Sequence, residues 1–428
     1  MRAPAAGGGT RDPAIVVVGA GVIGVCTAWF LARRGARVVL LERAAVAAGA
    51  SEGNAGTISP GHPPINRPGR VAQALRSLRN PSSPLYVAPR WDPALARWLW
   101  SFARHCGAEQ VERGMAALAP LGRATPELFD EVIETAGIAC DHRKNGYLEV
   151  YRTPAGLTAG REEAELIARH GFAPEELPGD ALREREPSFG PGVIGGWHHP
   201  EGSTVNPRRF VVGLADACRA IGVELRTGTA VTGVRVEAGR ARGVTVASGE
   251  EVAADAVVVA TGAYGGGLLG ALGHALPVQP AKGYHLDRDP ARPGTPPLAA
   301  ACLLGEGSVF VTPMDGFVRF AGTLEFSGLN HEIRRDRLEQ LTRVAARYLE
   351  GIGPAEPLDE WVGLRPVTPD GLPAIGGIPG REGLYVATGH GMLGLTLGPV
   401  TGRLLAETIL DGRASLPLAP FDPGRFLR

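Results

Sequence analysis

The stretch from Pro13 to Glu42 constrains the fold of this chain more than any other. An apolar run, Ala14 to Val18, precedes the sequence Gly19-Ala20-Gly21-Val22-Ile23-Gly24, which leads into ten residues rich in helix formers. A second apolar run, beginning at Val38, ends at Glu42. This order predicts a strand, a glycine turn, a helix and a second strand, the unit that binds dinucleotides.

Each glycine of the turn has a separate physical task. Gly19 permits the tight turn, Gly21 lets the backbone approach a pyrophosphate, and Gly24 lets the helix pack on the sheet. Free N–H groups at the helix start face the phosphates. Glu42 lies 23 residues after Gly19, close to the spacing at which a carboxylate accepts hydrogen bonds from a ribose hydroxyl and repels a 2′-phosphate.

Two simpler interpretations compete with a dinucleotide site. The glycine pattern alone is weak, because 61 of the 428 residues are glycine. Ala14 to Ala32 carries no charge and resembles a membrane span in composition, but its glycines and β-branched residues favour a strand and turn. A purely structural strand-helix-strand unit would explain Glu42 by chance alone.

Composition limits the classes of partner. Lysine plus arginine and aspartate plus glutamate both number 44, so no basic excess favours nucleic acid or a membrane surface as a general partner. The five cysteines are far apart and form no Cys-x-x-Cys pair, which argues against disulfides and zinc and favours a cytoplasmic location. We therefore expect no metal.

The remaining segments suggest how the chain is organised. Residues 1–12 are expected to form a flexible tail, and residues 63–136 to be mostly helical. Trp98, Trp100 and Phe102 in that region pack within their own domain or, alternatively, form an apolar patch for peripheral contact at the inner membrane face. From Gly146 onward short strands predominate.

The loop from Ala50 to His62 gives the first specific resemblance. Together with the glycine turn and Glu42, its sequence Ser-x-Gly-Asn-Ala-Gly-x-Ile-Ser-Pro-Gly resembles FAD-dependent D-amino-acid dehydrogenases of the glycine oxidase, sarcosine oxidase and D-amino-acid oxidase group. The stretch from Trp361 to Gly376 resembles the Gly-Leu-Arg-Pro-x-Thr-x-Asp-Gly-x-Pro-x-Ile-Gly signature of the same group. Residues 52 and 53 depart from the pattern, as does His62, where the dehydrogenases often carry tyrosine.

The resemblance implies FAD as the cofactor. It places the 54–56 loop beside the flavin ring and pyrophosphate, the backbone of Val231 at the adenine, and the segment after His390 at the flavin's pyrimidine edge. The residues expected to contact FAD are Gly19, Gly21, Val22, Ile23, Gly24, Glu42, Arg43, Asn54, Ala55, Gly56, Val231, Thr261, Gly262, Gly391, Met392, Leu393, Gly394 and Thr396.

The resemblance also names the substrate residues. Arg365 is expected to bind the α-carboxylate of an amino acid, since a guanidinium fork meets a carboxylate through two parallel charge-assisted hydrogen bonds. Tyr284 is a candidate for a further hydrogen bond to that carboxylate, and Lys282 or His285 for tuning the flavin. His62 completes the expected catalytic set.

The implied fold is α/β. A Rossmann-type FAD-binding domain is built from the discontinuous segments 13–62, 201–265 and 361–428, and a mixed-sheet α+β substrate domain with a helical segment from 63–200 and 266–360.

The implied reaction is oxidative deamination of a D-amino acid by hydride transfer. Electrons then pass to oxygen or to a quinone-linked chain. Alternatives are a sister enzyme acting on glycine, sarcosine or D-hydroxyproline, a nicotinamide-dependent dehydrogenase, and a flavin-binding protein without catalysis.

Overall fold

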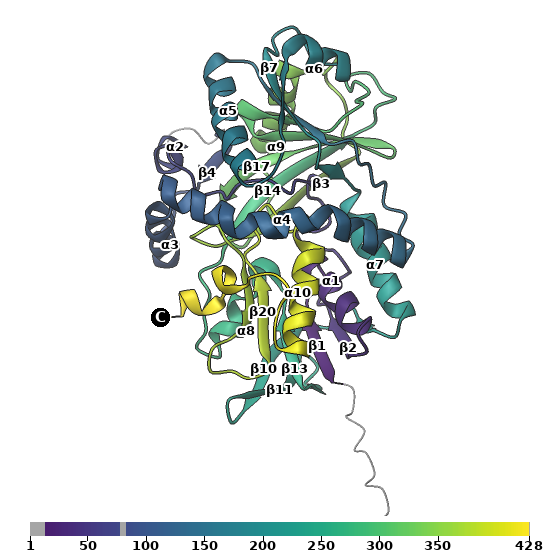
Figure 1. The fold of residues 1–428 in the computed structure, drawn as a ribbon, viewed down its shortest axis with the longest axis vertical. Helices are drawn as coiled ribbons and strands as arrows, with labels where there is room; N and C mark the ends of the chain where they lie inside the picture. The colour runs from purple at the N-terminus through teal and green to yellow at the C-terminus, as the bar shows by residue number, and fades with distance from the viewer. Residues whose placement is uncertain (1–12, 78–82, 428) are drawn as a thin grey trace, which may run out of the picture.

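A computed structural model describes residues 13–77 and 83–427 of the chain (Figure 1). The tail expected at residues 1–12 lies outside the described residues. Two sheets dominate, one in the lower half and one in the upper half of Figure 1, with a long helix, α4, running across between them. This arrangement confirms the predicted α/β class with a second, mixed-sheet part.

The first sheet is the predicted dinucleotide-binding sheet. It has six strands in the order β19-β20-β13-β1-β2-β9, parallel except at β19. The strands are β1 (Ala14–Val18), β2 (Arg37–Leu41), β9 (Glu224–Arg226), β13 (Ala256–Val259), β19 (Ala374–Gly377) and β20 (Leu384–Thr388). Residues from the beginning, middle and end of the chain therefore share one sheet.

Strand β1 is buried on both faces because it lies in the middle of a parallel sheet. Ile15 and Val17 pack against three helices, namely α1 (Val22–Ala32), α7 (Pro207–Ala220) and α10 (Gly398–Asp411). Val16 and Val18 pack on the opposite side, against a three-stranded sheet of β10 (Val231–Glu237), β11 (Arg240–Val246) and β12 (Glu251–Ala253). Because successive side chains of β1 point to opposite faces of the sheet, this one strand contributes to two separate hydrophobic cores.

The second sheet has nine strands, in the order β18-β14-β17-β16-β15-β5-β7-β6, with β4 paired to β17. They are β4 (Leu85–Val87), β5 (Tyr147–Tyr151), β6 (Glu175–Pro178), β7 (Gly195–His199), β14 (Gln279–Arg288), β15 (Cys302–Leu304), β16 (Val309–Met314), β17 (Phe317–Phe326) and β18 (Asp359–Val367). Helix α9 (Arg335–Tyr348) packs on β14, β16 and β17.

The remaining elements belong to neither of the two large sheets. They are α2 (Arg70–Ser77), α3 (Pro93–Arg104), α4 (Ala108–Ala136), α5 (Pro154–Arg169), α6 (Gly179–Arg185), α8 (Gly266–Gly270), the pair β3 (Thr57–Ile58) and β8 (Ser203–Thr204), and the 3₁₀ turns η1 (Gly262–Tyr264), η2 (Gly305–Gly307), η3 (Ala419–Phe421) and η4 (Pro423–Phe426). In the described part of the chain, no helix combines the length and apolarity needed to cross a bilayer.

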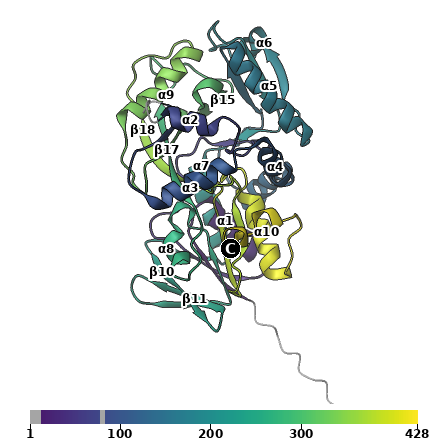
Figure 2. The ribbon, with the colours of Figure 1, turned by 90° about the vertical axis from the view of Figure 1, so that its left-hand side faces the viewer.

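Two segments depart from the expected domain boundaries. The boundary expected at residue 361 falls inside β18, and β18 pairs with β14 along its whole length in the second sheet. Helix α4, expected in the substrate domain, buries Leu118, Leu128 and Phe129 in the core of the first domain. Figure 2 shows α4 beside α10. Sequence order alone does not reveal such packing across domains.

Candidate active site

A cavity of about 350 Å³ lies where the two sheets meet. Its walls include Val18, Leu41 and Ala260, which end or follow β1, β2 and β13 at their carboxyl ends, and Arg365 from β18 of the second sheet. The carboxyl ends of strands in an open α/β sheet are where such folds bind ligands. The cavity therefore joins the predicted cofactor turn to the predicted substrate residue.

Most predicted site residues line this cavity. They are Gly19, Gly21, Val22, Ile23, Glu42, Arg43, Asn54, Ala55, His62, Val231, Thr261, Gly262, Arg365, Gly391, Met392 and Gly394. The predicted residues that do not line it are Gly24, Gly56, Lys282, Tyr284, His285, Leu393 and Thr396.

The glycine turn has the predicted close approaches. Gly19 adopts φ +104°, and a Cβ there would lie 2.6 Å from the carbonyl oxygen of Ala260 on the neighbouring strand. A Cβ on Gly24 would lie 1.8 Å from the carbonyl oxygen of Gly19, so Gly24 supports helix packing rather than contacting the cavity. Gly19 and Gly21 thus present backbone, without side chains, at the wall where a pyrophosphate would bind.

The carboxylate of Glu42 is held beside the turn. Its two oxygens accept hydrogen bonds from the amides of Ala20 at 2.8 Å and Ala44 at 2.9 Å. A carboxylate oxygen can accept more than one hydrogen bond, so Glu42 remains able to accept from a ribose hydroxyl. Because Glu42 lines the cavity in this orientation, the residues present fit the adenosine end of a dinucleotide.

The N–H groups at the start of α1 were expected to be free, but one of them has a hydrogen-bond partner in the protein. The N–H of Val22 donates to Oγ of Ser51 at 2.9 Å. Ser51 also lines the cavity, and its place in the glycine-rich loop is the signal that could have identified it. We conclude that Ser51 ties the loop to the helix start.

The 54–56 loop reaches the wall through its first two residues. The amide of Gly56 donates to Oδ1 of Asn54 at 2.9 Å. A Cβ on Gly56, which has φ +73°, would lie 2.4 Å from Cε of Met314. Gly56 therefore packs closely against Met314, away from the cavity, while Asn54 and Ala55 face the cavity.

Arg365 presents a cation to the cavity without a balancing carboxylate. Its Nη1 donates to the carbonyl oxygens of Thr323 at 2.6 Å and Lys282 at 3.5 Å. Among the described residues, no carboxylate lies within 4.0 Å of its guanidinium. Burial lowers the pKa of Arg365 to about 10, so the side chain stays protonated at neutral pH. A half-buried cation with no counter-charge favours an anionic ligand.

Gly283 gives Arg365 the space it occupies. A Cβ at residue 283 would lie 2.4 Å from Cζ and both terminal nitrogens of the guanidinium. Because a guanidinium is the mobile end of its side chain, Gly283→Ala is expected to displace Arg365 without unfolding β14. We expect KM for a carboxylate substrate to rise roughly tenfold, since a positioned charge-assisted contact is lost. The control Gly233→Ala, on β10, adds a Cβ in open space and should leave KM unchanged.

Two histidines at the cavity are neutral. Burial, followed by the charge of Arg67, lowers the pKa of His62 to about 4. Burial lowers the pKa of His390 to about 3, and its Nε2 lies 3.1 Å from Oγ1 of Thr401. Both line the cavity, so both offer polar but uncharged ring atoms at neutral pH.

Tyr284 lies away from the cavity, contrary to the expectation. Its hydroxyl donates to Oε2 of Glu325 at 3.2 Å, in the second domain's interior. Lys282, two residues earlier on β14, also points to that side and donates to the carbonyl oxygen of Glu332 at 3.1 Å. Alternate residues of a strand face opposite sides, and Gly283 is the one that meets Arg365. Tyr284 is thus not placed to bind the substrate carboxylate.

The C-terminal segment lines the cavity less completely than expected. Leu393 packs in the core of the first domain, and Oγ1 of Thr396 accepts from the amide of Ser59 at 3.1 Å. Helix α10 begins at Gly398, two residues beyond Thr396. Thr396 accordingly joins this segment to the 50–62 loop.

Many other cavity residues besides Ser51 were missing from the prediction, and four of them illustrate why. Tyr264, Phe310, Leu364 and Leu395 come from segments whose individual patterns are those of ordinary turns and buried strands. Arg43 lies over the ring of Tyr264, with Cζ 3.9 Å from the ring centroid. The packing of separate segments creates this part of the wall.

Comparison with known proteins agrees with the geometry. The profile of the family described as FAD dependent oxidoreductase (DAO) matches residues 14–408. The D-amino acid dehydrogenase of Methylobacterium nodulans is 36% identical over 406 residues, covering 94% of this chain and 96% of the relative. That of Phenylobacterium zucineum is 35% identical over 413 residues, covering 95% and 96%.

Solved structures share the fold. Glycine oxidase from Geobacillus kaustophilus aligns with a TM-score of 0.77 at 24% identity, over 96% of this chain and 98% of that one. Iminodiacetate oxidase from Chelativorans sp. BNC1 aligns with a TM-score of 0.73 at 23% identity, over 96% and 98%. The resemblance predicted from the sequence is confirmed.

Proposed function

The chain belongs to the FAD dependent oxidoreductase family, and on that premise we propose that it converts D-amino acids to 2-oxo acids and ammonia. The observation that carries the proposal is the uncompensated guanidinium of Arg365 in the same cavity as the glycine turn. The curated relatives bearing the name D-amino acid dehydrogenase support it.

The residues of the cavity divide the work between cofactor and substrate. Gly19, Gly21 and Glu42 would hold the pyrophosphate and ribose of FAD, and Arg365 would hold the substrate carboxylate. FAD supplies the acceptor for the two electrons and the α-hydrogen that leave the substrate as hydride. Water then hydrolyses the resulting imino acid to the 2-oxo acid and ammonia.

The chain itself contributes mainly orientation. Among the described residues that line the cavity, Glu42 is the only one with a carboxylate. Two backbone amides hold that carboxylate beside the glycine turn. His62 and His390 are neutral, so neither repels a substrate amine by charge. We propose that the amine reacts in its neutral form and that Arg365 fixes the α-carbon in one pose.

A panel of amines tests the substrate class. Anaerobic addition of a D-amino acid to the purified protein should bleach the flavin absorbance and yield one 2-oxo acid and one ammonia per flavin. The L-enantiomer should not. Stronger bleaching by glycine, sarcosine or D-hydroxyproline would favour a sister enzyme, and no bleaching by any amine would favour a flavin-binding protein without catalysis.

For the electron acceptor, we propose a membrane-bound quinone-linked chain reached from a cytoplasmic position. Helix α3 exposes Trp100, whose side of the helix also carries Arg104, with Cζ 4.7 Å from the Trp100 ring centroid. Trp91, just before α3, is 96% exposed. Exposed tryptophans with arginines suit a bilayer interface with anionic lipids. Trp98 and Phe102 are buried against Phe326 and β4, which is the packing within the domain expected as the first of the two alternatives for this region.

Vesicle sedimentation tests this contact. The full protein should pellet with anionic lipid vesicles, and Trp91→Ser with Trp100→Ser should reduce the bound fraction severalfold because two interfacial rings are removed. The control Ile221→Ser removes an exposed apolar side chain at the end of α7. Equal pelleting of the double variant and the wild type would contradict the proposal, as would rapid peroxide release with oxygen as sole acceptor.

A further inference from the structure

Two consecutive peptide carbonyls in the loop beside the cavity are held from the second sheet. The carbonyl oxygen of Gly53 lies 2.7 Å from Nδ1 of His285 on β14. The carbonyl oxygen of Asn54 accepts from Nη1 of Arg319 on β17 at 2.9 Å. In the same loop, Asn54 and Ala55 form part of the cavity wall.

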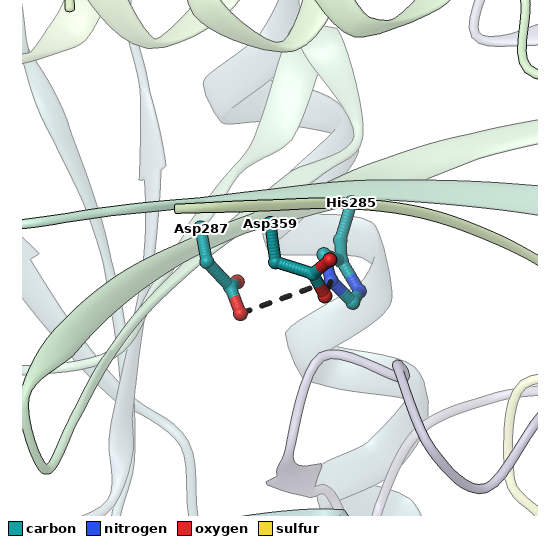
Figure 3. A group of neighbouring side chains, drawn as sticks. All are labelled: His285, Asp287 and Asp359. Carbon is teal, nitrogen blue, oxygen red and sulfur yellow. Dashed lines mark hydrogen bonds and ion pairs between the residues drawn. The ribbon is translucent and has the colours of Figure 1, made fainter. Parts of the chain in front are cut away.

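The first contact fixes the protonation of one ring nitrogen. A carbonyl oxygen can accept but not donate, so Nδ1 of His285 must carry the hydrogen. Nε2 then faces two carboxylates, with Oδ2 of Asp359 at 3.3 Å and Oδ2 of Asp287 at 3.8 Å. Figure 3 shows the three side chains on one side of the β14–β18 pair. In the protonated form of the ring both nitrogens donate, Nδ1–H to the carbonyl of Gly53 and Nε2–H to these carboxylates, so the carboxylates orient the ring.

The second contact is a buried ion pair. Nε and Nη2 of Arg319 each donate to an oxygen of Asp287 at 2.8 Å, leaving Nη1 for Asn54. Both side chains are only 7% exposed. A bidentate pair of this kind holds the guanidinium plane in one orientation, so the direction of Nη1 is also fixed.

Packing around Gly53 shows how closely the loop meets this group. A Cβ at Gly53 would lie 2.3 Å from Cδ2 of Trp361 and 2.6 Å from Cε1 of His285. The rings of His285 and Trp361 stack, with centroids 5.2 Å apart. This contact explains why glycine stands at residue 53.

The strands that hold the loop also carry the substrate residue. On the β14–β18 ladder, Asp287 pairs with Asp359, His285 with Trp361, and Ala281 with Arg365. We propose that His285, Asp359, Arg319 and Asp287 form a carbonyl clamp that positions the Asn54–Ala55 wall relative to Arg365. These four are positioning residues for hydride transfer, and this role rests on the proposed function.

The same three side chains of Figure 3 have ligand atoms within 4.8 Å of one another, the spacing of a cation site. Arg319 already places a positive charge on both oxygens of Asp287. A bound metal would compete with that charge. The clamp explains the hydrogen bonds from His285 and Arg319 to the loop without a metal. Treatment with a chelator therefore distinguishes the clamp from a metal site.

The variant His285→Phe tests the clamp. It keeps a ring to stack on Trp361 and removes both nitrogens. Hydrogen exchange of the backbone from 50 to 58 in the cofactor-free protein should accelerate at least tenfold. In the FAD-loaded protein, the limiting rate of flavin reduction should fall about 10- to 100-fold, because small misplacements of reacting groups are costly. The substrate concentration for half-maximal rate should change less than threefold, since Arg365 is intact.

Two further variants sharpen the test. Asp359→Ala, at a side chain 62% exposed, should reproduce the exchange effect in weaker form without threatening the fold. Glu360→Gln is the matched control, because the neighbouring carboxylate pairs with Arg335 rather than with His285. It should behave as wild type in both measurements.

Several outcomes would overturn the clamp. These are unchanged exchange in His285→Phe, a wild-type reduction rate in the fraction that retains FAD, or a loss of both exchange protection and rate when the wild type is treated with a chelator. Failure of the proposed function is distinct: the wild-type flavin would then not be reduced by any D-amino acid, while the exchange difference would remain measurable.

Discussion

Arg365→Ala is expected to raise KM for D-amino acids by about 100-fold, with FAD retained. The guanidinium lines the cavity, and no described carboxylate lies within 4.0 Å to balance it. A charge-assisted pair with the substrate contributes about 3 kcal/mol, which corresponds to roughly 100-fold in binding. Steady-state kinetics with a dye acceptor, together with the flavin absorbance of the purified variant, measures both quantities.

Arg335→Ala is the matched control for this variant. Its side chain is 71% exposed and pairs with Glu360 on the surface of the second domain. Its loss should leave KM and flavin content unchanged. If Arg365→Ala kept the wild-type KM, Arg365 would not bind the substrate carboxylate, and the assignment of the cavity would be wrong.

Gly19→Ala is expected to yield protein with at least tenfold weaker FAD binding. The residue adopts φ +104°, and the added Cβ would lie 2.6 Å from the carbonyl oxygen of Ala260. Strained backbone of this kind costs about 1–3 kcal/mol, and relief of the clash must move the turn away from β13. Titration of the cofactor-free variant with FAD, followed by flavin fluorescence, gives the affinity.

A second glycine separates strain from contact. Gly35 has φ +87°, and a Cβ there would meet no atom within 4 Å. Gly35→Ala should therefore lower stability moderately through strain while FAD affinity stays near that of the wild type. Equal loss of FAD affinity in the two variants would show that general destabilisation, and not the shape of the turn, limits cofactor binding.

The parts of the site predicted from the sequence are those with local causes. The turn from Gly19 to Gly24 has one conformation that its glycines favour, and Glu42 follows at a fixed spacing along one strand-helix-strand unit. Arg365 was identified through the resemblance, and its burial without a counter-ion gives that assignment a physical basis.

The remaining parts depend on contacts between distant segments. The prediction that Tyr284 faces the substrate was wrong. The alternation of side chains along β14 does not reveal which face of the strand meets the cavity, because that depends on its pairing with β18. The role of His285 depends on Gly53, 232 residues away in the chain. The burial of Trp98 depends on Phe326, which lies on β17.

Binding of a plain carboxylate tests the central claim most directly. Benzoate has the carboxylate of a substrate but no α-hydrogen, so it should enter the cavity without reacting. We predict a saturable change in the flavin absorption spectrum of the wild type, competitive with a D-amino acid and absent in Arg365→Ala. An undiminished spectral change in Arg365→Ala, or none in a wild-type protein that oxidises D-amino acids, would contradict the claim that Arg365 binds the acid group beside the flavin.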